Sequence, residues 1–172
     1  MKNYFEIFDL PVSFDIDLKQ LEKNYFQLQQ KFHPDKNSNN YDNIASKSLD
    51  SIQHSILVNQ GYKILIDDLQ RAIHLLQIAG INIEDDECNH KPSILTLQTI
   101  LDLQEQIDKI ADINQILTLK NDIKNNIKSI LQDFCKTLEI NDLSTATQLL
   151  IKAKYLSKTL NDLKIKEKRN NF

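Results

Sequence analysis

The chain has 172 residues, enough for one large domain or two small ones. A net charge of −3 and a pI near 5.8 argue against a nucleic-acid-binding or anionic-membrane protein, and no apolar run is long enough to span a bilayer. Only two glycines and three prolines occur, which favours an all-α fold. The widely separated Cys88 and Cys135, and an N-terminus without a signal-peptide pattern, indicate reduced thiols and a cytoplasmic location.

A short apolar segment and a basic helix come first along the chain. Residues 4–10 are mostly apolar and stop at Pro11, so one or two helical turns are expected. Asp15 and Asp17 are candidate N-caps for a helix that runs to about residue 32. Apolar residues recur along this helix at helical spacing, which predicts one buried stripe: Leu18, Leu21, Tyr25, Leu28 and Phe32.

A loop and two further helices are predicted next. The proline and the Asn/Ser run in residues 33–40 have turn chemistry and predict an exposed loop. A long helix over about residues 41–66 is expected to bury Ala45, Leu49, Ile52, Ile56, Tyr62 and Leu65. Gly61 weakens this helix by about 1 kcal/mol relative to alanine, which indicates close packing at that point. Asp67 or Asp68 can then start a short helix that Gly80 would close.

The second half begins with a predicted linker. Residues 81–91 are acidic and lack helical periodicity. Pro92 suits the first turn of a helix that runs to about Ala111, and a longer helix is expected over residues 113–139.

A third helix completes the second half. Asn141 or Asp142 can cap it, and the basic tail at residues 164–169 is expected to fray. Near-heptad apolar spacing and short connections in these three helices predict an antiparallel three-helix bundle. The predicted division is therefore a first domain over residues 1–80, the linker, and a bundle domain over residues 92–172.

The most informative motif is His33-Pro34-Asp35, followed by Lys36, in the loop after the basic helix. With this tripeptide in this position the sequence resembles the J-domain family. Further residues match the HscB subgroup of that family and extend the resemblance over nearly the whole chain: Tyr4, Phe5, Phe8, Leu10, Pro11, Tyr25, Val58, Asn59, Gln60, Gly61, Tyr62, Leu65, Asp67, Leu69, Arg71, Ala72, Leu75 and Leu76. The resemblance implies an N-terminal J-domain followed by a helical client-binding domain.

The resemblance further implies that the first half binds a DnaK/HscA-type chaperone and stimulates its ATPase. The chaperone-binding residues would be His33, Pro34, Asp35, Lys36, Lys19, Lys23 and Lys31. Pro34 restricts the backbone and holds His33 and Asp35 in a repeatable pose, while the lysines can attract an acidic patch and raise the association rate. On this interpretation these residues act on a partner's chemistry. The chain itself is expected to be neither an enzyme nor a cofactor protein.

For the second half, the resemblance implies a surface that binds an IscU-type iron–sulfur scaffold protein as client. The matching residues are Leu97, Leu101, Asp102, Glu105 and Tyr155. Leu97, Leu101 and Glu105 recur at four-residue intervals and therefore share one helical face. Leucines at this spacing also suit a buried core, so the sequence leaves both possibilities open. Gln98 and Lys109 depart from the family pattern, which favours an apolar residue and an acid at these positions.

Other interpretations stay open at this point. The chain could be a J-domain co-chaperone for another client, or a helical scaffold that dimerises through residues 92–163 and whose His-Pro-Asp is incidental. A metal site on Cys88 and His90 is not expected, because two ligands do not complete a tetrahedral site. His54 and His74 are expected at surface or boundary positions, and we expect a monomer.

Overall fold

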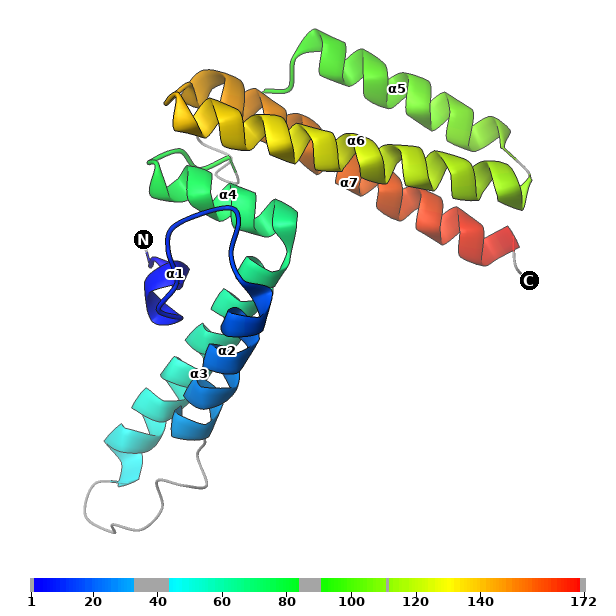
Figure 1. Cartoon of the computed structure of the whole chain (residues 1–172). Helices are drawn as coiled ribbons and strands as arrows, with labels where there is room; N and C mark the ends of the chain where they lie inside the picture. The colour runs from blue at the N-terminus through cyan, green and yellow to red at the C-terminus, as the bar shows by residue number, and fades with distance from the viewer. Residues whose placement is uncertain (1, 33–43, 84–90, 111, 171–172) are drawn as a thin grey trace. The chain divides into compact units, whose positions relative to one another are not determined.

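The computed structural model describes residues 2–32, 44–83, 91–110 and 112–170. Seven α-helices and no strand occur in these ranges (Figure 1), which confirms the all-α prediction. The chain divides into two compact units, Met1–Ile78 and Ala79–Phe172. Among the helices described, none combines the length and the apolar character that a membrane span requires.

The first unit is a helical hairpin with two short flanking helices (Figure 1). Its helices are α1 (Tyr4–Ile7), α2 (Leu18–Phe32), α3 (Ile44–Ile66) and α4 (Asp68–Ile78). The antiparallel helices α2 and α3 pack against each other, and α1 and α4 both pack against α3. The core of the unit consists of apolar side chains from all four helices and the residues that follow α1: Phe5, Phe8, Leu21, Val58, Leu65, Ala72, Ile73, Leu75 and Leu76.

Carboxylate caps fix the starts of two of these helices. Of the two predicted candidates, Asp17 caps α2, because its Oδ1 accepts from the backbone N–H groups of Lys19 at 2.9 Å and Gln20 at 3.3 Å. Asp67 caps α4 in the same way, accepting from the N–H of Gln70 at 2.9 Å. Beyond the end of α4, Gly80 has a φ of +93°, a conformation that glycine adopts without strain.

Gly61 marks the close approach of α1 to α3, as its place in the sequence predicted. A Cβ atom at Gly61 would lie 2.7 Å from Cδ1 of Tyr4 and 2.9 Å from Cε2 of Phe8. Both rings come from the N-terminal segment, so the missing side chain is what allows that segment to rest on α3.

The contact between α2 and α3 is partly polar, and it corrects the predicted burial. The ring of Tyr25 stacks on Tyr62 at a centroid distance of 4.1 Å, and Asn59 Oδ1 accepts from Tyr25 Oη at 2.9 Å and from a neighbouring amide side chain. Two apolar residues nearer the start of α3, Ile52 and Ile56, are about half exposed. The prediction that these two are buried is wrong. Leu18, expected on the buried stripe of α2, is also exposed.

The second unit is a three-helix bundle. Its helices are α5 (Ile94–Lys109), α6 (Ile113–Glu139) and α7 (Leu143–Asn170). Helices α6 and α7 pack in antiparallel fashion over most of their length, and α5 packs against α7 (Figure 1). The core is aliphatic apart from one phenylalanine: Ile100, Ile107, Ile116, Ile123, Ile130, Leu131, Phe134, Ala146, Leu150, Ile151, Ala153, Leu156, Leu160 and Leu163.

The start of α5 lies later than the sequence predicted. Ser93 is the N-cap, since its Oγ accepts from the N–H of Thr96 at 3.2 Å, and Pro92 therefore precedes the helix instead of forming its first turn. The third helix begins at the predicted place, where Asp142 accepts from the N–H of Thr145 at 3.1 Å. Asn141 adopts a φ of +56° in the tight turn before it.

The C-terminal tail does not fray, contrary to expectation. Helix α7 continues to Asn170. Glu167 accepts a charged hydrogen bond from Lys120 of α6 at 2.7 Å, with both side chains mostly buried. Lys166 donates to the backbone carbonyls of Ile107 and Asp108 at the end of α5. These contacts attach the last turns of α7 to both other helices.

Candidate partner-binding surfaces

The lysines predicted to bind a chaperone lie on one strip of α2. Lys19, Lys23 and Lys31 are exposed, and together with Gln27 they recur at four-residue intervals, which keeps them along one side of the helix. The helix ends at Phe32, directly before the predicted motif. The motif residues His33, Pro34, Asp35 and Lys36 lie outside the described residues, so the structure gives no geometry for them.

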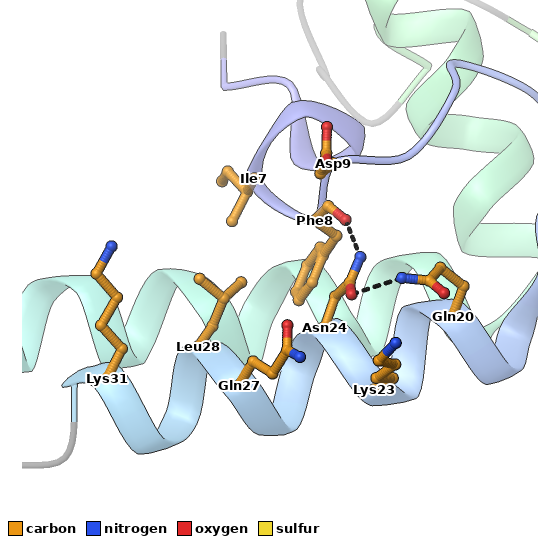
Figure 2. A pocket seen from close by; sticks show the side chains of 9 residues that line it. All are labelled: Ile7, Phe8, Asp9, Gln20, Lys23, Asn24, Gln27, Leu28 and Lys31. Carbon is orange, nitrogen blue, oxygen red and sulfur yellow. Dashed lines mark hydrogen bonds between the residues drawn. The ribbon is translucent and has the colours of Figure 1, made fainter.

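A hollow of about 460 Å³ lies between this strip and the N-terminal segment. Figure 2 shows the nine residues that line it, from α1, α2 and the residues after α1: Ile7, Phe8, Asp9, Gln20, Lys23, Asn24, Gln27, Leu28 and Lys31. The lining combines two lysines and three amides with apolar side chains and the single carboxylate of Asp9. Such a lining suits polar or acidic side chains of another protein better than an apolar small molecule.

Hydrogen bonds fix the N-terminal segment against α2 at one end of this hollow. Asn24 Nδ2 donates to the backbone carbonyl of Phe8 at 2.6 Å, and Gln20 Nε2 donates to Asn24 Oδ1 at 2.8 Å (Figure 2). The amide of Asn24 therefore satisfies a carbonyl that α1 leaves open at its end. These contacts fix the distance between the N-terminal segment and the lysine strip.

Two buried polar residues of α4 hold the same segment from the other side. His74 is buried, contrary to the sequence expectation, and its Nε2 accepts from the N–H of Tyr4 at 3.1 Å. Burial lowers the pKa of His74, and the Gln77 side chain partly opposes this shift. Arg71, also buried, donates from Nε to the carbonyl of Phe14 at 2.8 Å and stacks over the Phe14 ring. The segment before α2 is thus anchored at both of its ends.

On α5, the predicted client-binding leucines lie outside the bundle core. Leu97 is 43% exposed and Leu101 is 59% exposed, whereas Ile100 and Ile107 of the same helix are buried. The predicted acids Asp102 and Glu105 are exposed as well, and Glu105 pairs weakly with Lys109 at 3.4 Å across exposed side chains.

Sequence reasoning missed two neighbours of these leucines. Ile94 and Leu95, in the first turn of α5, are the two most exposed residues of the helix among its large apolar side chains. Ile94 lies three residues before Leu97 and seven before Leu101, so it continues their side of the helix. That spacing was visible in the sequence, but it becomes informative only when the buried side of α5 is known.

Tyr155 lies on the side of α7 that faces α5. Gln148 Nε2 donates to the carbonyl of Lys91, and Lys166 donates to that of Ile107; these bonded pairs are 57 and 59 residues apart, so α7 runs in the direction of α5. Tyr155 comes seven residues after Gln148 and eleven before Lys166, spacings that place all three on the α7 side next to α5. The same offset puts Tyr155, which is partly exposed, level with Leu97.

The side-chain composition of the α5 surface is that of a protein-binding site. Within the described ranges, no group of three or more His, Cys, Asp or Glu side chains is arranged to hold a metal ion. Cys88 and His90, considered as metal ligands from the sequence, lie outside the described residues. Exposed leucines beside carboxylates and a tyrosine form an apolar centre with a polar rim, which is the composition of a protein–protein interface.

Known proteins resemble this chain along nearly its whole length. The model of the HSCB C-terminal oligomerisation domain matches residues 95–164. The co-chaperone protein HscB homolog of Acinetobacter baylyi is 35% identical over 164 residues, covering 94% of this chain and 88% of that protein, and the homolog of Shewanella oneidensis is 30% identical over 167 residues, covering 94% of each chain.

Solved structures agree with this result. The crystal structure of human co-chaperone protein HscB superposes with a TM-score of 0.86 at 27% identity, covering 96% of this chain and 82% of the human one. Chaperone HscB from Vibrio cholerae shares the fold, with a TM-score of 0.83 at 24% identity over 98% and 99% of the two chains. The sequence identity and coverage of the Acinetobacter baylyi homolog show that this chain belongs to the HscB family of co-chaperones.

Proposed function

We propose that this protein stimulates the ATPase of a DnaK/HscA-type chaperone and delivers an IscU-type iron–sulfur scaffold protein to it. The first unit would act as the J-domain and bind the chaperone, and the bundle would bind the scaffold protein. The observation that carries the proposal is the exposure of Leu97 and Leu101, at 43% and 59%, on a side of α5 that the bundle core does not use. Family membership supports the co-chaperone role.

The lysine strip on α2 supports the chaperone-binding half of the proposal. The strip reaches Lys31 near the end of α2, and the predicted His-Pro-Asp motif follows α2 directly in the sequence. Exposed lysines attract an acidic partner at long range and raise its association rate, whereas a proline-restricted motif can supply a defined contact once the partner has arrived. The two features would therefore act in sequence on the same chaperone.

The chaperone-binding half is tested with an ATPase assay on a purified DnaK/HscA-type chaperone. The wild-type protein should raise the hydrolysis rate, and His33→Gln should abolish the increase while circular dichroism and the thermal midpoint stay unchanged. His54→Gln, an exposed histidine on α3, is the matched control and should stimulate like wild type. An unchanged rate with wild-type protein would exclude the proposed role.

Apolar side chains with acids beside them support the client-binding half. Leu97 and Leu101 lie on adjacent turns of α5, and Glu105 lies one turn further on. Tyr155, on the neighbouring helix, is level with Leu97. Apolar anchors of this kind contribute most of the binding free energy in many interfaces, and the polar rim contributes orientation.

Binding to an IscU-type scaffold protein tests this half. Leu97→Ala combined with Leu101→Ala should raise the dissociation constant by at least tenfold, since each truncation removes an apolar anchor worth about 1 kcal/mol or more. The thermal midpoint should stay within a few degrees, because neither side chain is buried. Leu117→Ala combined with Ile165→Ala is the matched control, since these residues are comparably exposed on α6 and α7. Melting of the bundle by the first pair would show that the leucines serve folding.

Bridging is the proposed mechanism. When one chain holds both partners, the linker raises the local concentration of the client at the chaperone. Residues 1–80 and 92–172 supplied as separate chains should keep some ATPase stimulation and lose the additional effect of the client. If the client still adds its full increase in ATPase rate when the two pieces are separate, tethering is excluded.

Self-association through the bundle is a second candidate function. It is favoured by the description of the matched family model as an oligomerisation domain. Sedimentation of the purified chain over a range of concentrations distinguishes the two candidates, because the co-chaperone proposal requires no change of mass, whereas a dimerising scaffold would double in mass and leave the ATPase of the chaperone unchanged.

A further inference from the structure

Five large apolar side chains on the described residues of α2 and α3 are exposed, and three of them are more exposed than Leu18 and Ile66. Phe26 of α2 is 55% exposed, and Ile52 and Ile56 of α3 are 48% and 51% exposed. A single exposed apolar residue needs no explanation, but several on one small unit raise the question of whether some of them lie together.

On α2, Phe26 lies on the side opposite α1. Asn24 faces α1, because its side chain bonds to the carbonyl of Phe8. Successive residues of an α-helix turn by about 100°, so Phe26, two positions later, is rotated by about 200° from Asn24. The ring of Phe26 lies beside that of Tyr25, with 5.6 Å between the ring centroids.

On α3, Ile52 and Ile56 lie on the corresponding side. Gly61 faces α1, as its contacts with the rings of Tyr4 and Phe8 show. Ile56 is five residues earlier and is rotated from Gly61 by about 140°, and Ile52 is nine residues earlier and rotated by about 180°. Phe26, Ile52 and Ile56 therefore share the face of the α2–α3 hairpin that is turned away from α1.

Cationic side chains border this patch. Lys19 and Lys23 lie seven and three residues before Phe26, and Lys63 lies seven residues after Ile56, so all three are on the same face. Glu22, four residues before Phe26, adds one acid, which leaves an excess of positive charge. An apolar centre with a cationic border fits a partner surface that has an apolar pocket edged with carboxylates.

We propose that Phe26, together with Ile52 and Ile56, is an apolar anchor for the chaperone, inserted into such an acidic-edged pocket. This inference rests on the proposed function and extends its contact from the lysine strip to the hairpin face beside it. Lys23 belongs to both surfaces: it lines the hollow beside the lysine strip, and it lies three residues before Phe26. The lysines govern the approach of the chaperone, and Phe26 governs how long it stays bound.

The test is a titration of chaperone ATPase against co-chaperone concentration. Phe26→Ala and Ile56→Ala should each raise the concentration needed for half-maximal stimulation, Phe26→Ala by about tenfold, with the maximal rate unchanged. Phe26→Tyr, which keeps the aromatic ring, should bind the chaperone like wild type. Val12→Ala, a comparably exposed apolar residue between α1 and α2, is the matched control and should behave like wild type.

Salt dependence separates the anchor from the lysines. Phe26→Ala should leave the slope of half-maximal concentration against ionic strength unchanged, whereas Lys19→Ala with Lys23→Ala should reduce it.

If Phe26→Ala titrates like wild type while His33→Gln abolishes stimulation, the anchor is overturned and the proposed function stands. If wild-type protein fails to stimulate, the proposed function itself fails. A dimer that Phe26→Ala dissociates would assign the patch to a second copy of this chain and overturn the chaperone as occupant.

Discussion

Replacing Gly61 by alanine should destabilise the first unit, although alanine is the better helix former. In an uncrowded helix the change would stabilise by about 1 kcal/mol. Here the new Cβ would lie 2.7 Å from Cδ1 of Tyr4 and 2.9 Å from Cε2 of Phe8, distances that real Cβ contacts do not reach. Phe8 is almost completely buried and has little room to move. Overpacking of this kind costs about 1–3 kcal/mol, and subtracting the helix-propensity gain leaves an expected net loss of up to about 2 kcal/mol.

Urea unfolding followed by circular dichroism measures this loss. The midpoint should fall with an unchanged m-value, which identifies a change in stability and not in the denatured state. Gln60→Ala, on the exposed side of the same turn, is the control and should shift the free energy of unfolding by less than about 0.5 kcal/mol. In a Tyr4→Ala background the nearest contact is gone, so Gly61→Ala should cost less, and the difference gives the coupling between α1 and α3.

A stabilising effect of Gly61→Ala would refute the reasoning. It would mean that α1 can move off α3 at no cost, and that the helix propensity of alanine outweighs the contact. The hollow between α1 and α2 would then not be held at a fixed width, and the lysines that line it would lose their fixed distance from the N-terminal segment.

Three further predictions concern buried polar groups. Arg71→Met should lower the free energy of unfolding by about 3 kcal/mol in urea titrations, because it leaves two backbone carbonyls without their donor; a loss below about 1 kcal/mol would contradict this. Because burial lowers the pKa of His74 below its ordinary value near 6.5, the unfolded chain binds more protons, so stability should be full above about pH 6.5 and decline as pH falls, and His74→Gln should flatten the profile. Lys120→Met should lower the free energy of unfolding by about 1–2 kcal/mol, whereas Lys136→Met, in an exposed pair, should leave it almost unchanged; equal losses would show that burial of the Glu167 pair is unimportant.

Local signals in the sequence predicted the helix boundaries well. Asp17, Asp67 and Asp142 each cap the helix that follows them, and a cap depends on an interaction between residues only two or three positions apart. Gly61 was informative for a similar reason, because a glycine inside a helix has a cost that needs a compensating contact. The sequence identified the need for that contact, and the structure identifies the two rings that make it.

Features that depend on distant residues were not predictable. The last turns of α7 are held by Lys120 and by carbonyls of α5, which lie 47 and about 59 residues away, so a basic tail that looks frayed in sequence is fixed in the bundle. His74 was expected at a surface or boundary position, yet its ring packs beside the rings of Tyr4 and Phe5 and accepts a hydrogen bond from the N–H of Tyr4, 70 positions earlier.

On both candidate surfaces, the spacing of apolar residues in the sequence does not show which of them are buried. On α5, apolar residues occur around more than half of the helix, so spacing alone does not decide whether Leu97 and Leu101 or Ile100 and Ile107 face the core. The packing against α7 decides it, because the side of α5 that carries Ile100 and Ile107 is buried there. On α2, the same reasoning applies to Phe26, which lies among polar residues and was invisible to a search for stripes. Phe26, Ile52 and Ile56 gather on one face of the hairpin outside its core, and this clustering, more than the exposure of any one of them, points to a partner protein.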